Sequence, residues 1–273
     1  MAGSSSATAR PTKFGEPRTL ARLGLAALAA LGVIAAVLAV LAQGAGGGVV
    51  HTVTEGLTSR GFWTAVAVGL AARTVDGALG WAYGMTSTTF LLSTGVPPAA
   101  ASASVHVAEI FTTAFSGLSH WRLGNVDGAL FRRLLIPGAI GAVAGATLLT
   151  SVDGEAIKPF VSVYLLGMGL YVLSKAFRTL KTRRAPPRAV VPLALGGGFV
   201  DAVGGGGWGP VVTTTLVGGG QDPRTTIGTV NAAEFFIALA SGLSFTLLGG
   251  LTLWTTIAGL ILGGLFAAPL AAG

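Results

Sequence analysis

The sequence predicts an all-α, polytopic membrane protein made of two inverted-topology repeats, each of which opens with a broken helical hairpin. The first observation is composition: only 10% of the 273 residues are charged, 52% are hydrophobic, and the mean hydropathy is +0.75. Soluble domains carry charge on about 25% of their residues, so the apolar surface of this chain is expected to face lipid. The second observation is a series of apolar segments long enough to span a bilayer, and the third is an internal repeat.

The residue types exclude several classes of function. The chain has no cysteine, which excludes disulfides, thiolate metal sites and cysteine nucleophiles. The net charge of +7 comes largely from cationic runs at residues 10–22, 122–133 and 175–188, which lie between apolar segments. Such runs are typical of the cytoplasmic loops of membrane proteins. Because no run is interleaved with aromatic residues, we expect no nucleic-acid partner.

The chain begins with a polar tail and an extra helix. Residues 1–19 are small and polar, which predicts a disordered cytoplasmic tail. Residues 20–61 are expected to form an additional transmembrane helix, over the apolar run 23–42, and an outer loop. A cleaved signal peptide is the alternative. The run is longer than the ~7–15 residues of a signal-peptide core and matches the ~20 residues of a spanning helix.

Loop charges decide how the next apolar segment is threaded. The segment 62–95 is too long for one upright helix and is interrupted by glycines. If it crossed only once, the basic runs at 122–133 and 175–188 would lie outside, against the positive-inside rule. If it enters and returns as a broken hairpin, both basic runs lie inside, and the acidic loop with Asp153 and Glu155 lies outside. The sequence therefore predicts a multi-pass protein of the inner cell membrane with a cytoplasmic N-terminus.

The chain matches itself at an offset of 125 residues. Residues 75–124 and 200–249 align without a gap and are identical at 19 of 50 positions. The first unit starts outside and the second inside, so the repeats are inverted, an arrangement found in secondary transporters. No segment mirrors the last helix of the first repeat, so the second repeat is expected to be truncated; the alternative is that the second half has lost this helix. We divide the rest of the chain into a first repeat (62–177), a basic cytoplasmic linker (178–189) and a second repeat (190–273).

Each repeat contains a glycine-rich break that is suited to bind an anion. The N–H groups at the start of a half-helix have no intrahelical partner, and the helix dipole is positive there. Threonine hydroxyls that follow each break are able to donate to an oxyanion. Close packing of helices through small residues is the alternative role of the glycines. The candidate substrate-binding residues are Gly80, Gly84, Thr88 and Thr89 in the first repeat, and Gly205, Gly206, Gly207, Gly209, Thr213, Thr214 and Asn231 in the second.

Ionisable side chains also fall inside the predicted membrane segments. An ionised acid at mid-bilayer costs about 3 kcal/mol or more, so Glu109 and Glu234 are either proton-coupling groups or protonated structural groups bonded to a neighbouring helix. His106 lies one turn before Glu109 and shares both alternatives. Asp76 and Asp201 are predicted to cap the half-helices by accepting from their free N–H groups, because a carboxylate would repel an anionic substrate.

The second break carries a motif that suggests a family. The segment 200–210 (VDAVGGGGWGP), followed by GQDPR at 220–224 and by Gly228, Thr229 and Asn231, resembles the TauE/SafE sulfite exporter family. The resemblance extends from about residue 62 to the end, and the first repeat carries Gly95, Pro97, Pro98 and Ser104 after its own break. It implies transport of small sulfur anions, such as sulfite or sulfonates, across the cell membrane.

The breaks and the resemblance together predict a secondary transporter of small anions. The first candidate substrates are sulfite and related sulfur oxyanions or organosulfonates, moved by alternating access at a midplane site between the inverted repeats. Two alternatives are an intramembrane aspartyl-type enzyme that uses Asp76 and Asp201, and a passive channel. We expect no enzymatic activity, no cofactor and no metal, and the expected partners are the lipid bilayer and the anion. The sequence determines neither the direction of transport, nor the coupling ion, nor the oligomeric state.

Overall fold

The computed structural model describes residues 49–79, 82–176, 189–249 and 253–267. These residues form helices joined by short loops, and no strand occurs among them, so the all-helical part of the prediction is confirmed. The predicted tail, the helix at 23–42 and most of the basic linker lie outside the described residues. The elements of the first part of the chain are α2 (Val49–Thr58), α3 (Arg60–Leu79), α4 (Tyr83–Ser93), α5 (Pro98–Arg122), α6 (Gly128–Ser151) and α7 (Gly154–Ala176).

The second part of the chain follows the same order of elements. Helix α8 ends 125 residues after α3 ends, and α10 begins 125 residues after α5 begins, as the self-match of the sequence indicates. The inverted orientation of the two units stays a prediction. The elements are α8 (Val190–Gly204), a π-helical turn η3 (Gly209–Thr213) continued by α9 (Thr214–Gly218), α10 (Pro223–Gly249) and α11 (Trp254–Ala267).

Local sequence signals explain where the helices begin and turn. The hairpin turns before α5 and α10 contain Gly95 (φ 88°) and Gly220 (φ 94°), at equivalent positions, and these left-handed conformations favour glycine. The carboxylate of Asp127 accepts from the N–H groups of the first turn of α6. Asp222 accepts from the backbone N–H and the hydroxyl of Thr225, both at 2.9 Å. These hydrogen bonds lower the pKa of the exposed Asp222 carboxyl, as expected for an N-cap.

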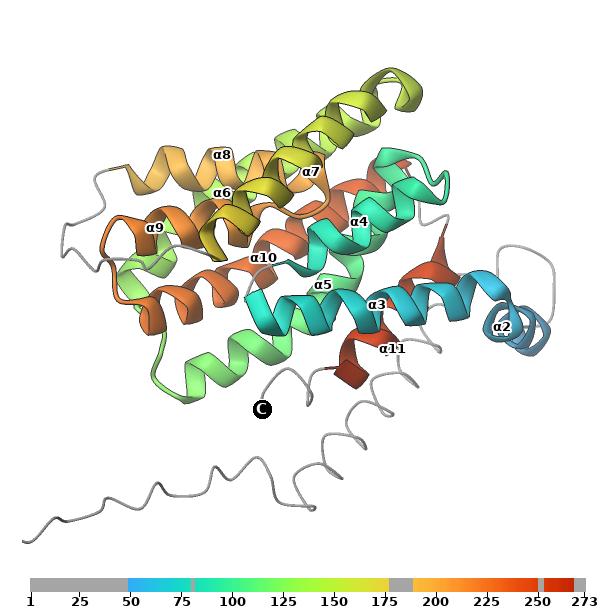
Figure 1. Ribbon diagram of the computed structural model, residues 1–273, viewed down its shortest axis with the longest axis horizontal. Helices are drawn as coiled ribbons and strands as arrows, with labels where there is room; N and C mark the ends of the chain where they lie inside the picture. Colours follow the sequence, from blue (N-terminus) through green and yellow to red (C-terminus); the bar gives the residue numbers. More distant parts are fainter. Residues whose placement is uncertain (1–48, 80–81, 177–188, 250–252, 268–273) are drawn as a thin grey trace, which may run out of the picture.

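The two parts of the chain are interlocked. Helices α5 and α10 pack together in the middle, between the α6–α8 pair on one side and the α3–α11 pair on the other (Figure 1). Each outer pair therefore joins a helix of the first part to one of the second. Glycines allow the close approach: a Cβ at Gly198 of α8 would collide with the carbonyl of Gly138 in α6. On the other side, a Cβ at Gly69 of α3 would lie 2.5 Å from the carbonyl oxygen of Leu260 in α11.

Apolar side chains cover the outside of the bundle. Among the described residues, three helices are long and apolar enough to cross a membrane: Gly128–Ser151, Gly154–Ser174 and Pro223–Gly249. Large apolar side chains on α7 and α10 are exposed, such as Phe160 at 74% and Leu247 at 76%. Helix α5 is less apolar because it turns polar side chains inward, and these are the buried Ser102, Ser104, His106, Glu109, Thr112 and Thr113. The exposed apolar surface is that of a membrane protein.

We predict that Gly198→Ala destabilises the bundle, whereas Gly196→Ala, two residues away on α8, does not. A Cβ at Gly198 meets the backbone of α6, while a Cβ at Gly196 has no atom within 4 Å. Overpacking of this kind costs about 1–3 kcal/mol. The measurement is the melting temperature of the purified chain in detergent. Equal melting temperatures for the two variants would contradict the observed α6–α8 contact.

Candidate functional site

The two helix breaks are built by one hydrogen-bond pattern that occurs twice. Asp76, near the end of α3, accepts from the N–H groups of Ala82 (2.8 Å) and Tyr83 (3.3 Å) through Oδ1. Asp201, near the end of α8, uses Oδ1 to accept from Gly207 (2.7 Å) and from Trp208 at 2.9 Å. Both acceptors and all four donors are equivalent at the offset of 125. Each carboxylate thus holds the positive N-terminus of the following half-helix against the preceding one.

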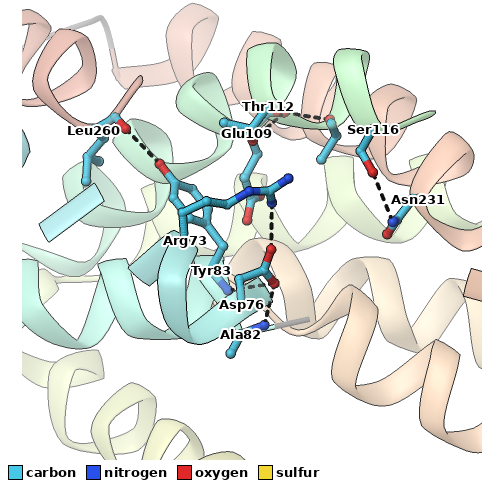
Figure 2. Close-up of polar contacts among 10 residues, drawn as sticks. Arg73, Asp76, Ala82, Tyr83, Glu109, Thr112, Ser116, Asn231 and Leu260 are labelled. Atoms are coloured by element: carbon cyan, nitrogen blue, oxygen red, sulfur yellow. Dashed lines mark hydrogen bonds and ion pairs between the residues drawn. The ribbon is translucent and has the colours of Figure 1, made fainter. Parts of the chain in front are cut away.

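The second carboxylate oxygen has a different partner in each break. In the first break, Nη1 of Arg73 lies 2.6 Å from Oδ2 of Asp76, and Figure 2 shows this carboxylate between the guanidinium and the backbone of Ala82. In the second break, Nε2 of His106 lies 3.1 Å from Oδ2 of Asp201. The first pair is partly exposed, whereas both side chains of the second are almost fully buried.

The histidine of the second pair has a polar partner at each of its two ring nitrogens. Nδ1 of His106 lies 2.8 Å from the carbonyl oxygen of Ser102, which can only accept, so Nδ1 carries a proton. The hydroxyl of Ser102 donates its own proton to the carbonyl of Ala202, at 2.6 Å. The contact between Nε2 and Asp201 is a hydrogen bond only if a second proton lies between them.

The two breaks touch each other through glycines. A Cβ at Gly84, in the first turn of α4, would lie 2.7 Å from Cα of Gly206 and 3.0 Å from the carbonyl oxygen of Gly205. Gly205 (φ 65°) and Gly206 (φ 139°) both have positive φ values, which a side chain would strain. The hydroxyl of Thr88 donates to the carbonyl of Gly205 at 2.6 Å. Residues that are distant in the sequence are thereby brought to one point in the interior.

Glu109 lies at this contact between the breaks. A Cβ at Gly84 would be 2.6 Å from its Oε1, and its Oε2 is buried with no hydrogen-bond partner. Its side chain points from α5 toward Arg73 and Tyr83 in Figure 2. Glu234, its counterpart on α10, is only half-buried. The sequence assigns the same alternative roles to both acids, but the structure buries Glu109 more deeply than Glu234.

The other predicted binding residues fall into three groups. Gly207, Gly209, Thr213 and Thr214 are buried at the second break, but the hydroxyl of Thr214 donates to the carbonyl of Pro210. In this conformation the hydroxyls of Thr88 and Thr214 therefore donate to backbone carbonyls rather than to an anion. Thr89 is exposed on α4, and Asn231 donates to the hydroxyl of Ser116 (3.2 Å) rather than to a break. Gly80 lies outside the described residues.

Two polar residues at the breaks were missed by the sequence interpretation. Arg73 is a cation within the predicted hairpin 62–95, and an ionisable residue at that depth is itself a signal. Tyr164, on α7, has a buried hydroxyl oxygen with no hydrogen-bond partner. Its ring and hydroxyl occupy the space where Cβ atoms at Gly204 and Gly207 would lie. Nothing in the apolar pattern of α7 marks that tyrosine.

The described residues contain no cluster of three histidine or acidic side chains that could hold a metal ion. The four carboxyls near the breaks are Asp76, Glu109, Asp201 and Glu234, and the cationic partners that they bind are Arg73 and His106. The arrangement can bind an anion at backbone N–H groups and can hold protons on acids.

Comparison with known proteins agrees with a transport role. The family model described as "Sulfite exporter TauE/SafE" matches residues 65–273, a range that contains both breaks. The probable membrane transporter protein YtnM of Bacillus subtilis (strain 168) is 44% identical over 214 residues, which cover 75% of this chain and 71% of that protein. No solved structure matches the chain.

We predict that Asp201→Ala destabilises the chain more than Asp76→Ala does. The first change leaves two buried N–H groups and His106 without their acceptor, and breaking a buried pair costs about 3–5 kcal/mol. Loss of the more exposed Asp76 resembles the loss of a helix cap, about 0.5–2 kcal/mol. Thermal unfolding in detergent measures both, with Glu155→Ala, an exposed acid on α7, as the control. The opposite order of stabilities would show that the second break does not depend on Asp201.

Proposed function

Since the chain belongs to the TauE/SafE sulfite exporter family, whose members are membrane transporters rather than enzymes, we propose that it is a secondary transporter of small anions. The proposed substrates are sulfite, related sulfur oxyanions and organosulfonates. The proposed mechanism is alternating access at a midplane site between two inverted repeats. The chain is a multi-pass membrane protein, and we place it in the inner cell membrane with its N-terminus in the cytoplasm.

The observation that carries the proposal is the contact between the two breaks at Gly84 and Gly206. A helix leaves about four N–H groups without intrahelical partners at its N-terminus, and each aspartate accepts from only two of them. The next N–H groups, including those of Gly84 and Met85, are suited to an anion that enters between the breaks. The glycines leave the backbone accessible to the anion once the two breaks separate.

The interlocked packing supports alternating access. Because α6 packs on α8 and α11 packs on α3, each outer pair combines helices from both parts of the chain. Movement of one pair relative to the other would separate Gly84 from Gly206 without breaking either pair. Two further side chains are candidates to contact the anion. Arg73 lies at the first break, and the hydroxyl of Tyr164 packs against the second. The remaining candidates are the substrate-binding residues that the sequence predicts.

The aspartyl-enzyme alternative fits the site less well. An aspartyl dyad needs two carboxyls that share one proton across a single site. Here Asp76 and Asp201 each accept from their own half-helix and pair with their own cationic partner. A passive channel differs from a secondary transporter in two properties: its flux does not saturate, and it does not depend on a gradient of a coupling ion.

The test is uptake of ³⁵S-labelled sulfite and methanesulfonate into proteoliposomes that contain the full chain, with protein-free liposomes as the control. We expect saturable uptake of at least one of the two anions that an excess of the unlabelled anion suppresses. Uptake that rises linearly with concentration would indicate a channel. Absence of uptake of every sulfur oxyanion and sulfonate tested would contradict the proposed substrate class.

We also predict that Gly84→Ala abolishes transport. A methyl group there would lie within 3.0 Å of Glu109, Gly205 and Gly206, two of them through backbone atoms, so the breaks cannot close against each other. Gly167→Ala on α7 is the control, because no atom lies within 4 Å of its added Cβ. Uptake by the two variants is compared at equal amounts of folded protein. Normal uptake by Gly84→Ala would mean that the contact between the breaks is not part of the transport cycle.

A further inference from the structure

Of the four carboxyls near the two breaks, Asp76 and Asp201 each have a basic partner, whereas Glu109 and Glu234 have none among the printed contacts of the described residues. Asp76 is balanced by Arg73, 2.6 Å away. Asp201 has the ring of His106 as its basic partner, with Nε2 at 3.1 Å from Oδ2. Glu109 is 4% exposed, and its Oε2 has no partner. It is the buried carboxyl at the contact of the breaks that has neither a cation of its own nor a full set of hydrogen bonds.

The neighbours of Glu109 do not supply a counter-charge. The groups that face it are Asp201 on α8, Glu234 on α10, Tyr83 on α4, and Asp76 and Arg73 on α3. Arg73 is already paired with Asp76, and the others are acids or a phenol. Helix α11, which also packs on α5, has no titratable side chain in its described range. An unpaired buried carboxylate is strongly disfavoured, so Glu109 carries a proton in this conformation.

This position links the proton to the anion. Oε1 of Glu109 lies beside Gly84, in the first turn of α4, where the proposed anion binds. An ionised Glu109 would repel an anion at that distance, whereas a protonated one would not and could donate to it. Coupling between two ligands is reciprocal, so a bound anion must favour the proton on Glu109 as much as the proton favours the anion.

We propose that Glu109 carries a proton together with the anion, one proton for each anion, and that its counterpart Glu234 does not. The proposal rests on the proposed transport function. The proton binds one carboxylate oxygen of Glu109 on one side of the membrane and leaves it on the other, and no covalent bond of the substrate changes. A singly charged anion is then carried without net charge.

The asymmetry follows from what surrounds the two acids. At the offset of 125, the place of His106 is taken by Asn231, which donates to Ser116, and the place of Arg73 is taken by Gly198. The two charged pairs, Arg73–Asp76 and His106–Asp201, therefore come from α3, α5 and α8. Glu109 lies on α5, the helix that carries His106. Glu234 faces the same Asp201, Asp76 and Arg73 as Glu109 does. Its side chain is only half-buried, whereas Glu109 is buried with its Oε1 beside Gly84. This difference in position makes Glu234→Gln a matched control for Glu109→Gln.

The first test uses methanesulfonate, which stays ionised at every relevant pH, so any proton that moves with it is carried by the protein. With the wild-type chain in proteoliposomes, a gradient of about one pH unit, acidic outside, should support roughly tenfold accumulation, as one proton per anion requires. Glu109→Gln should lose this accumulation but keep exchange of labelled for unlabelled methanesulfonate, because glutamine resembles the protonated acid. Glu234→Gln should accumulate as the wild type does.

Several outcomes would overturn the proposal. Accumulation by Glu109→Gln at the wild-type level, or its loss in Glu234→Gln alone, would assign the proton elsewhere. Wild-type uptake without acidification of the lumen, followed by a trapped pH dye, would mean that no proton accompanies the anion, whatever the variants do.

A second measurement does not depend on the substrate. Infrared spectra of the wild-type protein at neutral pH should contain the carbonyl stretch of a buried protonated carboxyl, which Glu109→Gln removes and Glu234→Gln leaves. A wild-type spectrum without that band would contradict the proposal even if no sulfonate is transported. Failure of all anion uptake with the band present would instead contradict the transport function alone.

Discussion

The structure depends on two aspartates that hold broken helices together inside an apolar bundle. A helix that stops at membrane depth exposes N–H groups that lipid cannot satisfy, and each such group costs several kcal/mol. Asp76 and Asp201 accept from two of these groups in each break. The carboxylates need partners in turn, and Arg73 and His106 provide them. These successive requirements explain why polar side chains are concentrated at the two breaks of a protein with so few charged residues.

Glycine makes the arrangement compact. The α6–α8 and α3–α11 contacts and the contact between the breaks all place backbone against backbone, at distances that a Cβ would prevent. The same absence of side chains leaves N–H groups accessible at the start of α4. Packing and binding are therefore not alternative roles of these glycines: Gly84 packs against Gly206 in this conformation and would be exposed to an anion in another.

The repeat in the sequence predicts the order of the helices and the places of the two breaks. It identifies both aspartates, both breaks and the equivalent starts of α5 and α10, because these positions are identical in the two units. It cannot predict where the units differ. Arg73 precedes the aligned residues and stands opposite Gly198 at the offset of 125, so the comparison of repeats conceals it. Tyr164 lies on α7, which also falls outside the aligned residues. The bonds of Thr88 and Asn231 depend on which helix lies opposite. A repeat within the sequence does not indicate which helix packs opposite a given side chain.

The central claim is that an anion binds at the half-helix N-termini where the two breaks meet. A crystal structure of the chain with selenite, an analogue of sulfite with an anomalous scatterer, tests it most directly. We expect a selenium peak within hydrogen-bond distance of the N–H groups at the start of α4 or η3, with Gly84 and Gly206 separated to admit the anion. A peak elsewhere in the bundle, with the breaks still in contact, would contradict it.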